Sequence, residues 1–124
     1  MDEISYKFRW KEKLHSRRDF GNVLRKGRKF FHPAFLVYVY ERNDGDSSVR
    51  LGLITNRKVG NAIERNYVKR RSREVFRTTK HLLKPGVDVA IAAKPQAVKL
   101  DFCSINIALR ALWRKAEILD KTVL

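Results

Sequence analysis

The sequence has one cysteine, Cys103, and therefore no pair for an intramolecular disulfide. This usage is typical of proteins in a reducing compartment and predicts a cytoplasmic location. The longest strongly apolar run, residues 34–40, is far shorter than the roughly 20 residues that cross a bilayer. The first residues include no apolar stretch typical of a secretory signal. We therefore expect no membrane partner.

Proline and glycine are also scarce, with three and six residues in a chain of 124. No stretch rich in them divides the sequence, so residues 1–124 are predicted to form one domain. Aromatic and basic residues alternate within residues 1–12, which form a basic aromatic extension. That alternation favours an extended segment, and a frayed tail is the alternative.

Acidic residues are few relative to basic ones, with 13 Asp and Glu against 28 Lys and Arg and a formal net charge of +15. The excess is concentrated in residues 1–30, which carry +6, and in residues 56–84, which carry +8. Such self-repulsion opposes compaction and usually indicates a polyanionic partner. Because a membrane partner is not indicated, nucleic acid is the expected one.

The apolar pattern predicts alternating helices and strands. A helix is expected over residues 16–26, with Ser16 and Asp19 as a capping pair, followed by strands over residues 30–40 and 49–55. The turn residues 43–46 between these strands predict that they form a hairpin. A second helix is expected over residues 61–81 and a buried strand over residues 87–93.

The last element is predicted to be a helix capped by Asp101, with a buried stripe of Ile105, Leu109, Leu112, Ala116 and Leu119. The order α-β-β-α-β-α predicts an α+β domain with two layers. Its sheet is expected to be small and mostly antiparallel, with about four strands packed against three helices.

The helix expected over residues 61–81 has two different faces at 100° per residue. One face is apolar and includes Val68, Ser72, Val75 and Thr79. A separate arc is cationic, and we call it the basic stripe; it consists of Asn66, Lys69, Arg70, Arg73, Arg77 and Lys80. A charged helix face is usually just exposed to solvent. Here, however, acidic partners at i+4 are nearly absent, and Arg, which suits bidentate phosphate binding, outnumbers Lys. We therefore interpret the stripe as a phosphate-binding surface.

Residues 57–62, with sequence RKVGNA, join a strand to this helix. Glycine permits close backbone approach, and a helix N-terminus offers N–H donors to phosphate. The spacing of a nucleotide-binding P-loop is absent.

These residues carry a family resemblance. The pattern begins with Arg50 and Gly52, continues through residues 58–62, KVGNA, and ends with Arg65-Asn66, Lys69-Arg70 and Arg73-Glu74. It resembles the signature of bacterial ribonuclease P proteins, roughly R-x-G-(n)-K-x-G-N-A-x-x-R-N-x-x-K-R-x-x-R-[EQ]. The likeness covers about residues 13–118 and extends to positions in the first helix and in two strands.

The resemblance implies the protein subunit of a ribonucleoprotein endoribonuclease that removes the 5′ leader of precursor tRNA. Its expected partners are ribonuclease P RNA, which carries the catalysis, and precursor tRNA; no obligate protein partner is indicated. Mg²⁺ is expected at the active site of the RNA, and the protein is expected to supply neither a catalytic residue nor a metal site. The family also implies a left-handed βαβ crossover, whereas almost all crossovers are right-handed.

The resemblance also implies site residues. The expected RNA contacts are Arg57, Lys58, Asn61, Arg65, Asn66, Lys69, Arg70, Arg73 and Arg77. A cleft for the leader is expected at Phe20, Leu24, Leu36 and Tyr38. Aromatic faces stack unpaired bases without demanding a sequence, which suits a variable leader. Without the resemblance, Phe20, Leu24 and Leu36 would be interpreted as core residues, and with it both interpretations stay open.

Tyr67 departs from the family, which often has Arg at this position. It lies outside the basic stripe, so stacking on RNA and simple packing both remain open for it.

Other functional classes are less well supported by the sequence. The histidines His15, His32 and His81 are dispersed without metal-ligand spacing, and Cys103 is expected to be a packed thiol rather than a nucleophile. A nuclease active without RNA is therefore disfavoured, and a DNA-binding protein lacks helix-turn-helix spacing. The stronger alternative is a general RNA-binding or ribosomal protein, which composition and charge do not exclude.

Overall fold

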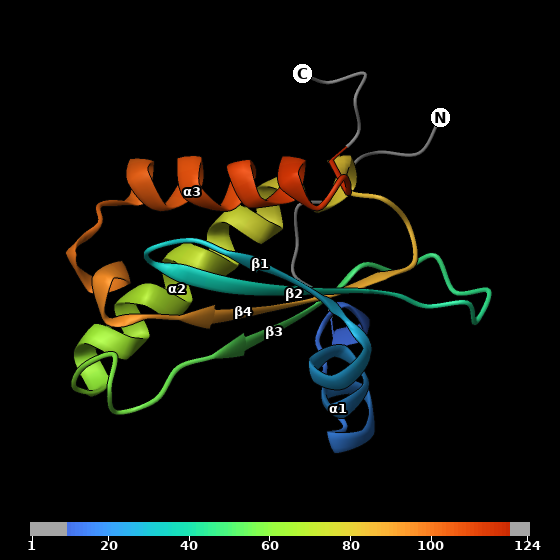
Figure 1. Ribbon diagram of the computed structural model, residues 1–124, viewed down its shortest axis with the longest axis horizontal. Coiled ribbons are helices and arrows are strands. Elements are labelled where there is room, and N and C mark those ends of the chain that lie inside the picture. The colour runs from blue at the N-terminus through green and yellow to red at the C-terminus, as the bar shows by residue number, and fades with distance from the viewer. Residues whose placement is uncertain (1–9, 120–124) are drawn as a thin grey trace.

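The computed structural model of the protein describes residues 10–119, in which three helices accompany a sheet of four strands (Figure 1). The helices are α1 (Arg17–Lys26), α2 (Ala62–Thr79) and α3 (Phe102–Lys115). The strands are β1 (Arg28–Phe31), β2 (Phe35–Glu41), β3 (Arg50–Ile54) and β4 (Val87–Ala93). Short 3₁₀ turns lie at Trp10–Glu12 (η1), Lys80–Leu82 (η2) and Pro95–Lys99 (η3). The α+β class and the numbers of helices and strands are confirmed.

The helix ends follow from local hydrogen bonds. Ser16 caps α1 by accepting a hydrogen bond from the backbone N–H of Asp19, and Asp101 caps α3 by accepting one from Ser104. Asp101 gains a pKa below its usual value mainly from that backbone hydrogen bond. The sequence predicts both caps, because short polar side chains satisfy the free N–H groups of a first helical turn.

The strand order is β1-β2-β4-β3, with β3 and β4 parallel and the other neighbours antiparallel. The predicted hairpin between residues 30–40 and 49–55 is therefore wrong. Pro33 instead separates β1 from β2, which pair with each other, and β4 lies between β2 and β3. The connection from β3 through α2 to β4 is a βαβ unit, and its left-handed sense stays a prediction from the family.

Helices cover both faces of the sheet, so the described chain has three layers rather than the expected two (Figure 1). The larger core lies between the sheet and α2 and α3, and contains Phe35, Phe76, Leu109 and Trp113. The smaller core lies under α1 and contains Leu14, Val23 and Ala90, with Phe20, Leu24 and Tyr38 against it. The apolar face of α1 packs on the sheet face opposite α2 and α3. Side chains alternate along β2 and β4, so each strand contributes residues to both cores.

The basic aromatic extension lies mostly outside the described residues. Within the described part, Trp10–Glu12 form a 3₁₀ turn instead of an extended segment. The Lys80 ammonium contacts the Glu12 carboxylate at 2.8 Å, which ties this turn to the end of α2. None of the helices in residues 10–119 combines the length and apolar character needed to cross a membrane.

Candidate RNA-binding surface

Helix α2 begins with a capping box. The Asn61 side-chain oxygen accepts a hydrogen bond from the Glu64 N–H at 2.9 Å, and the Glu64 carboxylate accepts one from the Asn61 N–H at 3.0 Å. A Cβ at Gly60 would lie 2.6 Å from the Glu64 carboxylate, so a side chain at this position would push the Glu64 carboxylate away from its place in the capping box. The GNA segment of the signature therefore starts the helix that carries the basic stripe.

The two predicted faces of α2 are present. Val68, Ser72, Val75 and Thr79 are buried against the sheet and α3, as expected. Arg65 and Lys69 are half-buried, whereas Asn66, Arg70 and Arg73 are exposed. Arg65, Lys69, Arg70 and Arg73 have no ion-pair partner within residues 10–119. Four cations thus lie close together on one helix without neutralisation, which favours an anionic ligand.

Three other sequence-predicted residues differ from these four. Arg77 forms an ion pair with Glu74 at 2.6 Å, and this hydrogen bond holds the pKa of the Glu74 carboxyl below its usual value. The oxygen of Asn61 is occupied by the capping box, which leaves its NH₂ group for RNA. Lys80, a member of the predicted stripe, is buried and paired with Glu12. Arg57 and Lys58 are exposed in the turn before the helix.

A hollow of about 280 Å³ joins the basic stripe to α1. Lys69 and Arg73 line one side of it, and Phe20, Lys13 and His15 line the other. The Phe20 ring packs on Gly52, where a Cβ would lie only 2.4 Å from a ring carbon. The glycine of the R-x-G segment therefore allows an aromatic side chain to reach the edge of the cationic surface.

The other predicted cleft residues lie on the same side of the sheet. Leu24 and Tyr38 are half-buried against the small core under α1. Leu36 is also half-buried, and it faces this side beside Ala92, its partner on β4. The Lys29 ammonium lies 5.8 Å from the centre of the Tyr38 ring. The hollow that contains Phe20 is not lined by the other three, so the four residues border a larger surface.

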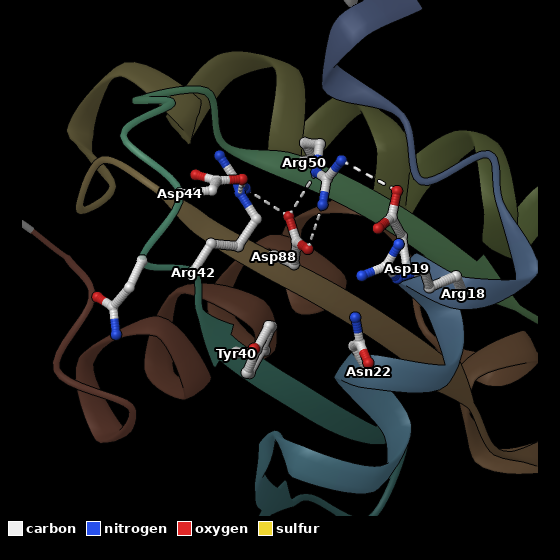
Figure 2. A pocket seen from close by; sticks show the side chains of 9 residues that line it. Arg18, Asp19, Asn22, Tyr40, Arg42, Asp44, Arg50 and Asp88 are labelled. Carbon is white, nitrogen blue, oxygen red and sulfur yellow. Dashed lines mark hydrogen bonds and ion pairs between the residues drawn. The ribbon is translucent and has the colours of Figure 1, made fainter.

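A second hollow, of about 400 Å³, lies beside the first turns of α1, where Arg18, Asp19 and Asn22 line it, and it contains a buried carboxylate (Figure 2). The Asp88 side chain on β4 is 1% exposed, and both its oxygens accept hydrogen bonds from Arg50 at 2.7 Å. Arg42 donates to the same carboxylate, while Arg50 reaches on to Asp19 of α1 at 3.2 Å. The hydrogen bonds to Asp88 raise the pKa of the Arg50 guanidinium above its usual value. The network thus links α1, β3 and β4.

Several residues were not predicted from the sequence. Lys13 and His15 line the Phe20 hollow, although they precede α1 and carry no pattern that would identify them. Cys103 is exposed, so the expectation of a packed thiol is wrong: it lies on the solvent-facing side of α3. No group of three or more His, Cys, Asp or Glu side chains in the described part of the chain is placed to hold a metal ion.

The fold and the surface together define a small basic α+β protein whose longest helix presents arginine and lysine beside an aromatic side chain, with no acidic partner for Arg65, Lys69, Arg70 and Arg73 in the described part of the chain. This combination is typical of proteins that bind RNA.

Comparisons with known proteins identify the family. The family described as Ribonuclease P matches residues 8–117. The ribonuclease P protein component of Dictyoglomus turgidum is 36% identical over 119 residues, covering 94% of this chain and 98% of the relative. That of Shouchella clausii is 32% identical, covering 87% of this chain and 88% of the relative. The chain therefore belongs to the ribonuclease P protein family.

Solved structures agree with this assignment. The ribonuclease P protein of Staphylococcus aureus superposes with a TM-score of 0.80 at 27% identity, covering 88% of this chain and 98% of that one. The ribonuclease P protein of Thermotoga maritima superposes with a TM-score of 0.73 at 30% identity, covering 84% of this chain and 96% of that one. The chain is accordingly a subunit of a ribonucleoprotein endoribonuclease of tRNA 5′ maturation, with ribonuclease P RNA as its partner.

Replacement of Asp88 tests the buried network. Asp88→Asn removes the buried carboxylate that Arg42 and Arg50 share and leaves them only the more exposed Asp44 and Asp19. Breaking a buried ion pair from one side costs about 3–5 kcal/mol. We expect the free energy of unfolding, measured by urea denaturation, to fall by about that amount. Asp44→Asn is the matched control, because exposed Asp44 contacts the same Arg42 at 3.1 Å. Equal, small effects of both changes would contradict a structural role for the network.

Proposed function

We propose that the protein binds ribonuclease P RNA and the 5′ leader of precursor tRNA, and so promotes Mg²⁺-dependent endonucleolytic removal of the leader. The supporting observation is the group of four cations on α2 that have no acidic partner within residues 10–119 and adjoin the hollow lined by Phe20. Phosphate groups would neutralise these cations, and an extended leader would lie along the adjoining aromatic surface. A cytoplasmic location remains part of the proposal, since tRNA maturation takes place there in bacteria.

Catalysis is assigned to the RNA subunit. Mg²⁺ would be bound by the RNA and would supply Lewis-acid chemistry there. The role of the protein is then to position the RNA and the substrate. Positioning can accelerate cleavage because reactants held together react as in a unimolecular step, which avoids much of the entropy cost of bringing them together.

The leader is proposed to contact the side of the sheet that carries Tyr38 and Leu36. Phe31 lies on the same side, opposite Leu36, and is 61% exposed. The Lys94 ammonium is 5.9 Å from the Phe31 ring, and Lys29 lies similarly near Tyr38. One exposed and one half-buried ring, each with an adjacent cation, match the needs of single-stranded RNA, whose bases stack and whose phosphates require positive charge. The contact is independent of sequence, as a variable leader requires.

Removal of the four unpaired cations should weaken RNA binding and reduce its dependence on salt. Each phosphate that is no longer neutralised lowers the magnitude of the slope of log affinity against log salt concentration by about 0.7–0.9, so four of them should lower it by up to about 3.6. The measurement is binding to ribonuclease P RNA over a range of KCl concentrations. The neutralised positions are Arg65, Lys69, Arg70 and Arg73, each changed to Gln.

The control neutralises four exposed cations elsewhere, with the same change in net charge: Lys26, Lys99, Arg114 and Lys115. It should leave the salt slope close to that of the parent protein. An equal decrease in slope in both variants would assign the effect to overall charge and remove the stripe from the interface.

Tyr38→Ala should reduce the preference of the assembled enzyme for precursor tRNA over mature tRNA. Stacking of one base contributes roughly 1–3 kcal/mol, so a decrease of about tenfold in the ratio of the two affinities is expected. Tyr38→Phe keeps the ring and should keep the preference. If Tyr38→Ala weakened the binding of precursor and mature tRNA equally, the loss would be explained by damage to the fold and not by a missing stacking interaction with the leader.

A further inference from the structure

A third hollow borders the basic stripe on the flank of α2 away from Phe20. It has a volume of about 320 Å³ and is lined by Ile63, Asn66, Tyr67, Arg70 and Arg71. At 100° per residue, Ile63 and Tyr67 lie on one side of the stripe, whereas Lys69 lies on the other. The stripe therefore separates this hollow from the one that contains Phe20.

The floor of this hollow is a fixed aromatic ring. The Tyr67 hydroxyl donates a hydrogen bond to the backbone oxygen of Leu100 at 2.7 Å, which anchors the ring to the segment before α3. The guanidinium carbon of Arg71 lies 5.1 Å from the ring centre. A stacked arginine of this kind presents a flat cationic surface to solvent, and nucleobases stack on such surfaces.

Ile63, an aliphatic side chain that is exposed to solvent, also lines this hollow. Ile63 is 80% exposed, the largest exposure among the exposed large hydrophobic side chains described, and Ile107 on α3 follows at 62%. Single exposed hydrophobic residues are common and need no explanation by themselves. Ile63 differs from Ile107 because it stands beside a ring, two arginines and the amide of Asn66, with no acidic side chain lining the space.

We propose that this hollow receives an unpaired nucleobase of ribonuclease P RNA, stacked between Ile63 and the Tyr67–Arg71 pair. An unpaired base supplies the flat apolar face that Ile63 and Tyr67 fit, and its phosphates supply the negative charge that Arg70 and Arg71 require. The inference rests on the proposed function, because it names a contact within the same RNA interface. The base belongs to the catalytic RNA rather than to the leader, since the leader is assigned to the α1 side of the stripe.

Tyr67 acquires a role through this arrangement. Its ring is half-buried and held by Leu100, so it packs against the protein and also exposes a stacking surface. The two alternatives that its sequence position left open are therefore combined in one side chain. Arg71, one turn later, supplies the cation beside the ring.

The test compares Ile63→Ser with Ile107→Ser in the full chain. Both isoleucines are exposed on helices and lie outside the cores, so neither change should unfold the protein. Binding to a bacterial ribonuclease P RNA transcript is measured over a range of KCl concentrations, with precursor and mature tRNA affinities measured for the assembled enzyme. Ile63→Leu, which retains an apolar side chain, is the conservative variant.

We expect Ile63→Ser to weaken binding of the RNA about tenfold with an unchanged salt slope, because a stacking contact releases no counterions. Ile107→Ser and Ile63→Leu should bind like the parent protein. Parent-like binding by Ile63→Ser would overturn the inference while leaving the proposed function intact. So would a reduced salt slope, or a decrease confined to leader-bearing tRNA. Failure of the parent protein itself to bind the RNA would instead overturn the proposed function, and the inference with it.

Discussion

Hydrogen bonds on both edges of β4 hold this strand between β2 and β3, and the two cores and the buried Asp88 depend on that position. Val87, Val89 and Ile91 face the larger core, whereas Ala90 faces the smaller one under α1. Asp88 lies on the α1 side as well, because its neighbours in the register are Tyr40 and Arg50. One strand therefore orients α2 on one face of the sheet and α1 on the other.

This arrangement brings two chemically different surfaces together. The α2 helix lies over one face of the sheet and supplies the cations. Phe20 of α1, on the other face, reaches the edge of this cationic surface, where it lines a hollow together with Lys69 and Arg73. Small residues make the approach feasible, since Gly52 leaves space for the Phe20 ring and Ala90 keeps the core under α1 thin. Part of the net charge of +15 lies on the solvent-accessible face of α2, where RNA would neutralise it and so reduce the self-repulsion of the folded domain.

Local features of the fold were predictable from sequence, and non-local ones were not. Ser16 and Asp101 identify the starts of two helices because capping involves only the next three residues. The buried arc of α2 follows from its periodicity. The insertion of β4 between β2 and β3 is a pairing between distant segments, and the turn residues 43–46 wrongly favoured a hairpin instead. The third layer was not predictable for a similar reason, because the periodicity of a helix does not tell which face of the sheet it covers.

The candidate site shows the same division. The basic stripe could be placed from residue types and helical spacing, but the pairing of Arg77 with Glu74 and of Lys80 with Glu12 depends on how the side chains lie in the folded protein. The family signature identified Arg50 and Gly52 without explaining them. Their structural reasons are the carboxylates of Asp88 and Asp19 for the arginine, and the Phe20 ring for the glycine. The hollow at Ile63 and Tyr67 depends on the position of Leu100, which no local pattern reveals.

The central claim is that this protein promotes cleavage by a catalytic RNA. Its most direct test is precursor-tRNA cleavage at low magnesium with three samples: the protein alone, bacterial ribonuclease P RNA alone, and the two together. We predict efficient removal of the 5′ leader only when both are present. Cleavage by the protein alone would contradict this claim, as would a folded, RNA-binding protein that fails to stimulate the RNA.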